Sequence, residues 1–179
     1  DLLQVLDDNR VSGEMCRSVV VSSVGAGEGK STIALHWALA AATAGKRVLL
    51  VDANLRQPML HRYLDLDDRS GSQPGLSDAL LREDLDFDGS LVRSTLAENL
   101  SVLTAGTFRP DPELFFTSDS LKLLVRRLQG RFDVVVYDTP ALSQGTDARQ
   151  LAAHTDGMAI VVMLEQAQME ETLQVLTEL

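Results

Sequence analysis

Residues 19–32 read VVVSSVGAGEGKST, an apolar run followed by a loop that contains three glycines, a lysine and a Ser-Thr pair. The apolar run has the length of a buried strand. The alanine- and leucine-rich stretch that follows, residues 31–46, predicts a helix that ends at Gly45. A strand, a glycine-rich loop ending in Gly-Lys-Ser and a helix, in this order, form the setting in which a phosphate-binding loop operates.

Each residue type in this loop has a physical role toward a polyphosphate. The glycines let successive backbone N–H groups turn toward a β-phosphate, and the start of the helix adds its positive end. Lys30 brings a mobile charge for the β- and γ-phosphates, the Ser31 hydroxyl suits Mg²⁺, and Thr32 lies toward the α-phosphate. The alternative is a glycine-rich turn with an exposed lysine. The predicted contacts are Gly25, Ala26, Gly27, Glu28, Gly29, Lys30, Ser31 and Thr32.

The rest of the chain predicts an α/β fold. Apolar runs at residues 46–53, 131–140 and 156–164 predict further strands buried on both faces. Residues 118–130 predict an amphipathic helix with its C-cap at Gly130. Strands that alternate with helices give a P-loop NTPase-type fold, in which a mostly parallel β-sheet is flanked by helices on both faces.

Two of the predicted strands end in aspartate. Asp52 is followed by Asn54 and Arg56, and Asp138 ends a second strand. Because ligands of open parallel sheets bind beyond the carboxyl ends of the strands, both carboxylates are expected beside the phosphate loop. The alternative is that each aspartate caps the turn that follows it. We predict Lys30, Asp52 and Asp138 as catalytic residues, Ser31, Asp52, Asn54 and Asp138 as metal ligands, and Arg56 as a further nucleotide contact.

Composition narrows the class of protein. With 179 residues the chain suits one domain, and its net charge of -10 argues against a nucleic-acid partner and against direct binding to an anionic membrane. A lone cysteine and the lack of a long apolar run or signal peptide predict a cytoplasmic location. The chain begins with Asp1 and stops within a helical pattern, so we expect that both ends can be cut points in a longer protein.

The motifs GEGKST, D-A-N-L-R-x-P and D-T-P together resemble the bacterial tyrosine kinase (BY-kinase) family. The stretches GLSDALL, NLSVLTAG and GTDARQLAAHTDG are also similar, so the resemblance covers roughly residues 17–164. That family writes its phosphate loop S-x-x-P-x-x-G-K-[ST], which explains why Val24 replaces the usual first glycine. Related partition ATPases carry a signature lysine where this chain has Gly25, so a partition-type ATPase is not expected.

The resemblance implies three nucleotide motifs: Walker A in the loop, Walker A′ around Asp52 and Walker B around Asp138. It implies that ATP or ADP with Mg²⁺ is bound, that phosphate is transferred to tyrosine, and that capsular or exopolysaccharide biosynthesis and export is regulated. The implied partners are a membrane polysaccharide co-polymerase subunit or a fused transmembrane region, and further copies of the chain. Either would place the protein at the inner face of the plasma membrane. Residues 17–179 would be the ATP-binding kinase-like domain, and residues 1–16 an extension or a truncated helix.

Some residues depart from the family pattern. Ala26 and Ala141 replace prolines, Leu164 and Glu165 stand where a basic residue is common, and the N-terminal E-x-x-R-x-x-R helix is missing. Asn54 replaces an aspartate of many relatives, and its amide brings neither a charge nor a base. The family's tyrosine cluster is absent: Tyr63 is expected to pack, and Tyr137 to lie in the core with a hydrogen-bonded hydroxyl. The alternative function is therefore a catalytically weak or inactive nucleotide-binding scaffold for a co-polymerase. A small-molecule P-loop kinase fits the motifs less well.

Overall fold

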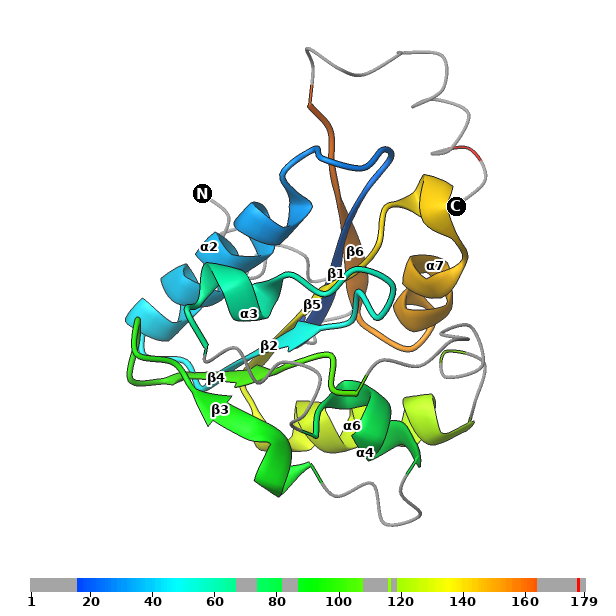
Figure 1. Cartoon of the computed structure of the whole chain (residues 1–179). Helices are drawn as coiled ribbons and strands as arrows, with labels where there is room; N and C mark the ends of the chain where they lie inside the picture. Colours follow the sequence, from blue (N-terminus) through cyan, green and yellow to red (C-terminus); the bar gives the residue numbers. More distant parts are fainter. Residues whose placement is uncertain are drawn as a thin grey trace.

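The computed structural model describes residues 16–66, 74–81, 87–107, 116, 119–163 and 177, and within them shows one sheet with helices on both sides (Figure 1). The strands are β1 (Ser18–Ser23), β2 (Val48–Asp52), β3 (Leu91–Arg93), β4 (Leu100–Leu103), β5 (Val134–Asp138) and β6 (Gly157–Val161). The helices are α2 (Lys30–Thr43), α3 (Leu60–Tyr63), α4 (Leu76–Leu81), α6 (Asp119–Arg131) and α7 (Asp147–Ala152), with short 3-10 turns at Asp88–Ser90 and Leu142–Gln144. None of the described helices is long and apolar enough to span a membrane.

The predicted fold class is confirmed. The strand order is β3-β4-β2-β5-β1-β6, and every pair is parallel except the β3–β4 pair at one edge. The helix α2 connects β1 to β2, which lie on either side of β5, and α6 leads into β5. This connectivity brings the carboxyl ends of β1, β2, β4 and β5 to the same edge of the sheet.

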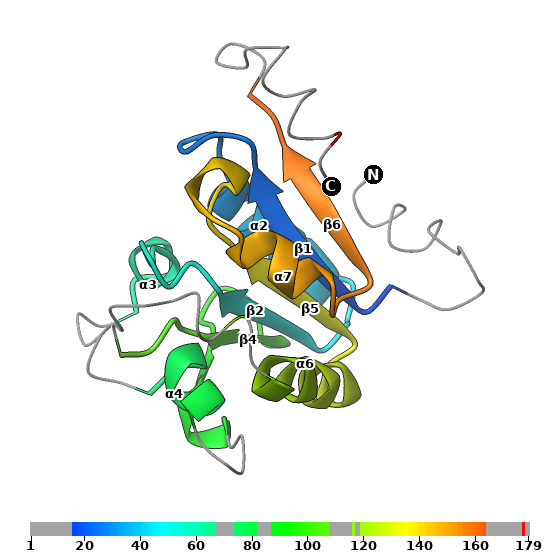
Figure 2. The same ribbon diagram turned by 90° about the vertical axis from the view of Figure 1, so that its right-hand side faces the viewer.

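Alternation along the strands builds two apolar cores, one on each face of the sheet. Val19 and Val21 pack under α2 and α3, whereas Val20 packs with α4, α6 and α7 on the other face. Figure 2 shows α6 and α7 in front of the sheet and α2 behind it. Trp37 of α2 is buried against the sheet, as predicted. The continuous apolar runs of β1, β2 and β5 follow from this two-sided burial.

The prediction that residues 156–164 form a strand buried on both faces is wrong in its burial. Every residue of β6 is only half-buried. The reason is position, because β6 is at the end of the strand order and pairs with β1 alone in the described part of the chain. An apolar run can identify a strand, but the number of its neighbours depends on the topology.

One predicted helix end is confirmed and another is wrong. The helix α2 ends at Thr43, and Gly45 follows with φ +83°, the left-handed conformation expected after a helix. Gly130, in contrast, lies inside α6, which continues to Arg131, so it is not a C-cap. The predictions for residues 1–15, Leu164 and Glu165 lie outside the described residues.

The two glycines predict opposite effects of alanine on stability. Gly130→Ala should raise the free energy of unfolding by about 0.5–1 kcal/mol, because alanine loses less backbone entropy within a helix and a Cβ at Gly130 meets nothing within 4 Å. Gly45→Ala should lower it by about 1 kcal/mol, because a side chain is strained at positive φ. Urea unfolding of both variants measures this. A loss of stability in Gly130→Ala would contradict the placement of Gly130 inside α6.

Candidate functional site

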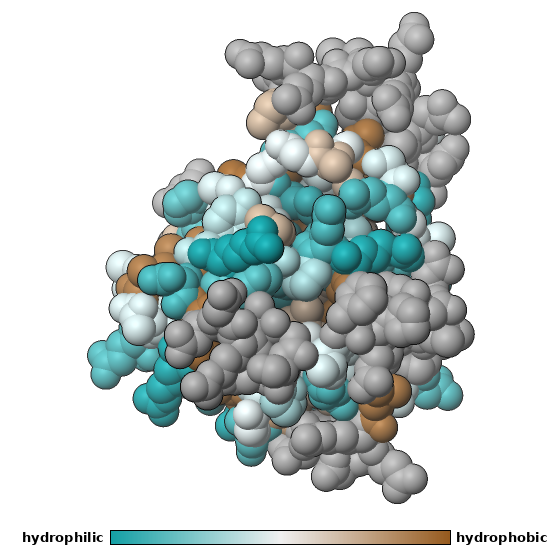
Figure 3. Space-filling model, viewed as in Figure 1, coloured by the Kyte–Doolittle hydropathy of each residue, from teal (hydrophilic) through white to brown (hydrophobic). Residues whose placement is uncertain are grey.

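A cleft of about 810 Å³ opens at the carboxyl edge of the sheet. The lining comes mainly from the loop after β1 with the start of α2, from the loop after β2 with α3, and from the segment after β4. Ser77 of α4 and Gln144 of the turn after β5 add to it. Hydrophilic side chains occupy much of the middle of this face (Figure 3). Of the predicted site residues, those that line the cleft are Ala26, Gly27, Gly29, Lys30, Ser31, Thr32, Asn54 and Arg56.

The start of α2 is built to receive an anion. Gly27 and Gly29 both have φ +83°, a conformation that glycine adopts without steric cost. Gly29 is the N-cap, no side chain caps the helix, and the first helical hydrogen bond runs from the Ile33 N–H to the Gly29 carbonyl. The N–H groups of the first turn are therefore available to a phosphate, and the ammonium group of Lys30 is added at the same place.

Two predicted nucleotide contacts brace the loop instead of lining the cleft. The Glu28 carboxylate accepts the Gly25 N–H at 2.9 Å, and the Ser23 hydroxyl donates to the Gly25 carbonyl at 2.6 Å. Glu28 is buried by this turn. The side chain of Glu28 thus shapes the loop from within, while its backbone stays part of the curve that faces the cleft.

Asp138 is a buried carboxylate without a hydrogen-bond partner. Its side chain is 1% exposed, and both carboxylate oxygens lack a partner among the described residues. Burial raises the pKa of Asp138 to about 6, although the nearby Ser31 hydroxyl and Lys30 ammonium counteract part of this rise. Neither group closes a hydrogen bond of ordinary geometry with Asp138. Two unpartnered carboxylate oxygens beside a serine hydroxyl fit a hard divalent cation such as Mg²⁺.

Asp52 lies beside Asp138, and its carboxylate also stabilises the start of α3. The two aspartates are register partners on β2 and β5. One carboxylate oxygen of Asp52 accepts the N–H groups of Met59 and Leu60, each at 3.1 Å, at the start of α3. The capping alternative is therefore realised for Asp52. Burial, and then the charge of Asp138, raise the pKa of Asp52 to about 7 despite these hydrogen bonds.

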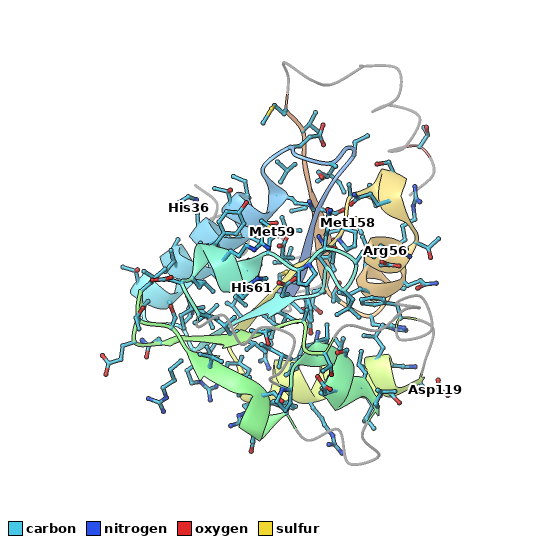
Figure 4. The ribbon with its side chains drawn as sticks, viewed as in Figure 1. His36, Arg56, Met59, His61, Asp119 and Met158 are labelled. Atoms are coloured by element: carbon cyan, nitrogen blue, oxygen red, sulfur yellow. The ribbon has the colours of Figure 1, made fainter. Side chains whose placement is uncertain are left out.

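The polar side chains after Asp52 are engaged in local contacts. The Asn54 side-chain oxygen accepts the Gln57 N–H at 3.0 Å, which closes a turn. Arg56 points toward α7, as Figure 4 shows, and its guanidinium group forms an ion pair with Asp147 at 2.8 Å. Arg56 also lines the cleft, and its predicted contact with the nucleotide stays a prediction. Its carboxylate partner Asp147 was not predicted.

Sequence reasoning also missed the wall of the cleft opposite the phosphate loop. This wall consists of Ser77 and residues 104–107, which follow the short strand β4. Asp78 holds the wall together by accepting the N–H groups of Gly75 at 2.9 Å and of Thr107 at 3.0 Å. A Cβ at Gly75 would lie 2.3 Å from the Gly106 backbone nitrogen, so glycine is required there. The usable signal was the segment LSVL, in which three of four residues are apolar; it was not predicted as a strand.

Each tyrosine departs from one expectation. Tyr63 is 50% exposed at the rim of the cleft and does not pack in the core. Tyr137 is fully buried, as predicted, but its hydroxyl has no hydrogen-bond partner among the described residues, which corrects that expectation. Its strand position fixes the ring in the core, where none of the described residues accepts a hydrogen bond from the hydroxyl.

Comparison with known proteins identifies the family to which this chain belongs. The model of the family described as ATPase MipZ matches residues 17–167. Tyrosine-protein kinase YwqD of Bacillus subtilis (strain 168) is 34% identical over 158 residues, which are 87% of this chain and 63% of that relative. The chain therefore spans less than two thirds of that kinase.

Solved structures give the same picture. The chimerical protein CapA2B2 superposes with a TM-score of 0.83 at 31% identity, over 93% of this chain and 71% of that one. The septum site-determining protein MinD from Pyrococcus horikoshii OT3, solved with Mg-ADP, superposes with a TM-score of 0.73 at 23% identity, over 92% of this chain and 65% of its own. The likeness to MinD is one of fold.

The loop predicts a large effect of removing one charge. Lys30→Met should weaken ADP binding by about 10–100-fold, because a charge-assisted hydrogen bond is worth about 1.5–3 kcal/mol. Lys46→Met is the matched control, since Lys46 is exposed and does not line the cleft. Calorimetry measures both affinities. Equal ADP affinity in Lys30→Met and wild type would remove this loop from the nucleotide site.

The raised pKa of Asp138 predicts a pH-dependent stability. The folded protein keeps this proton up to about pH 6, whereas the ordinary pKa is 3.8, so the stability that protonation contributes is lost as pH rises through about 6. Asp138→Asn lacks this titration. Relative to wild type, its free energy of unfolding should rise by about 3 kcal/mol from pH 4 to pH 8, at about 1.4 kcal/mol per pKa unit.

Urea unfolding without nucleotide or Mg²⁺ at both pH values measures this difference. Asp133→Asn is a control that should stay flat, because Arg47 lowers the pKa of Asp133 to about 2 and this carboxylate is already charged at pH 4. Its stability relative to wild type should hardly change between pH 4 and pH 8. A stability difference for Asp138→Asn that is the same at both pH values would show that Asp138 is not a buried carboxylate.

Proposed function

Since the chain belongs to the bacterial tyrosine kinase family and also matches the ATPase MipZ model, we propose that it binds Mg·ATP in this cleft and transfers the γ-phosphoryl group to tyrosine. The observation that carries the proposal is the unpartnered Asp138 carboxylate beside Ser31 and the uncapped start of α2. An anion site and a cation site therefore adjoin each other, which is what a metal-bound polyphosphate requires. Capsular or exopolysaccharide biosynthesis and export is the proposed process, with a membrane co-polymerase as partner.

The residues divide the work of phosphoryl transfer. The backbone of residues 25–32 and the Lys30 ammonium would hold the phosphates, while Ser31 and Asp138 would hold Mg²⁺ directly and Asp52 and Asn54 through water. When bound, Mg²⁺ would neutralise charge that develops between the β- and γ-phosphates. The phosphate loop and the two aspartates come from β1, β2 and β5, so the sheet sets their spacing.

Asp52 is the proposed acceptor of the tyrosine proton. Its pKa of about 7 lets it exist as a carboxylate near neutral pH and still bind a proton. One of its oxygens accepts two N–H groups at the start of α3, but among the described residues the other accepts only the Asn54 N–H, at 3.3 Å. That second oxygen is the one open to a proton. Because Asp52 is 1% exposed, we propose that the proton arrives through water.

A second candidate function is a nucleotide-binding scaffold with weak catalysis. Asn54 favours it, because this side chain brings no charge to Mg²⁺ and its oxygen already accepts the Gln57 N–H. Nucleotide binding needs only the loop and the metal, whereas transfer also needs the phenol in line with the γ-phosphate and a proton acceptor. Nucleotide binding, phosphate release and protein labelling with γ-labelled ATP, measured separately, separate the two functions.

The missing charge at position 54 can be restored. Asn54→Asp should raise phosphoryl transfer to an added tyrosine-rich peptide by about tenfold, because a carboxylate can both accept the Gln57 N–H and support Mg²⁺. Gln57→Glu is the matched control, since it adds the same charge at an exposed position on the cleft. The measurement is peptide labelling by γ-labelled ATP. Rapid labelling of wild type on Tyr63 or Tyr137 would contradict this account of the site.

A further inference from the structure

Arg56 and Asp147 form a buried, two-point ion pair next to the cleft. The Arg56 Nε–H donates to one carboxylate oxygen of Asp147 at 2.8 Å, and Nη2 donates to the other at 3.2 Å. Asp147 is 0% exposed, whereas the Arg56 side chain is 32% exposed and borders the cleft. The guanidinium group also lies against the Gly145 backbone, where a Cβ would come within 3.0 Å of Nη2. The pair is thus fixed in geometry on several sides.

The pair joins the two loops that carry the proposed metal ligands. Arg56 belongs to the loop after β2, with Asn54, and Asp147 begins α7 beyond the loop that follows Asp138. Next to the sheet, the Ala53 N–H donates to the Asp138 carbonyl at 2.8 Å. The Arg56–Asp147 pair continues this connection outward, 91 residues apart in sequence. A shift of one loop against the other would therefore change the spacing of the metal ligands.

Stability alone does not explain an ion pair whose carboxylate is fully buried. Removing a carboxylate from water costs several kcal/mol, and buried ion pairs are often no more stabilising than apolar side chains of similar size. The same cost makes the geometry rigid, because Asp147 without the guanidinium group of Arg56 would be a fully buried carboxylate that has lost both of these hydrogen bonds. A bidentate contact further fixes both the distance and the angle between the two loops.

We propose that Arg56 is a positioning residue, which acts on the Mg²⁺ site through Asp147 and is not a phosphate ligand. The inference deepens the proposed function and rests on it for the identity of the metal. The pair holds the turn made by Asn54 and Gln57 against the loop after β5. Loss of the pair lets this turn move relative to Asp138 and leaves the phosphate loop in place, since Lys30 and Ser31 belong to α2.

The two roles of Arg56 predict different dependence on metal. A phosphate ligand would contribute to ADP affinity without Mg²⁺ and would not depend on Asp147. A positioning residue would leave metal-free ADP affinity unchanged, and removal of either partner would weaken binding of the metal. The two partners would also act as one unit, so their effects would not add.

The first experiment is a binding comparison of the whole chain and its variants. Fluorescent ADP is titrated without Mg²⁺, and Mg²⁺ is then titrated at fixed ADP, for wild type, Arg56→Met, Asp147→Asn and the double variant. We expect metal-free affinities within about twofold of wild type and half-saturating Mg²⁺ raised about tenfold in each single variant, as for other residues that support metal ligands. The double variant should need no more Mg²⁺ for half saturation than the more affected single variant. Arg56→Lys should need less Mg²⁺ than Arg56→Met, because lysine keeps the charge but not the two-point contact.

The second experiment needs neither nucleotide nor metal. Amide hydrogen exchange should speed up in Asp147→Asn at Gln57, Met59 and Leu60, whose N–H groups bond to Asn54 and Asp52, and should stay unchanged in residues 25–32. The apolar double variant Arg56→Met/Asp147→Leu keeps the site filled if a single variant fails to fold.

The outcomes separate the two proposals. Unchanged half-saturating Mg²⁺ in Asp147→Asn, or loss of metal-free affinity in Arg56→Met, would overturn the positioning role. Unchanged exchange at Gln57, Met59 and Leu60 would also overturn it. A wild type that binds no nucleotide would contradict the proposed function instead, and the exchange comparison would still decide whether the pair positions the loop.

Discussion

Two carboxylates, Asp52 and Asp138, lie side by side at the ends of the central strands β2 and β5, both almost fully buried. Burial and their mutual repulsion raise the pKa of Asp52, and burial raises that of Asp138, so the fold holds two acids in a place that disfavours their charge. A cation at this place would relieve that cost. The same constraint accounts for the nearness of Lys30 and Ser31 to Asp138.

Hydrogen bonds within the protein hold the loops around these two acids in place. Glu28 bends the phosphate loop, Asp52 caps α3, and Asn54 closes the turn that follows. The Arg56–Asp147 pair then ties the loop after β2 to α7. A residue in a nucleotide motif can therefore stabilise the loop through its side chain while its neighbours line the cleft, and the structure distinguishes these two roles where a motif does not.

The sequence was sufficient where the determining contacts are local. The strand, loop and helix around Gly27 and Gly29 follow one another along the chain, and the parallel topology then places Asp52 beside Asp138. Contacts between distant segments could not be predicted. The Arg56–Asp147 pair spans 91 residues, and the contact of Gly75 with Gly106 also joins separate segments.

Local signals also failed when tertiary structure overrode them. A glycine such as Gly130 is typical of the position just after a helix, but α6 continues through it to Arg131. The strand β6 has the apolar pattern of a central strand but stands at the end of the strand order, so it is half-buried. In both cases the missing information was the packing of neighbouring elements.

A crystal structure with ADP and Mn²⁺, in which anomalous scattering locates the metal, tests the central claim most directly. The account predicts the metal within about 2.3 Å of the Ser31 hydroxyl and an Asp138 oxygen, close to the Mg–oxygen distance of about 2.1 Å, with Asp52 and Asn54 one water further away. A metal more than about 5 Å from all four side chains would contradict it.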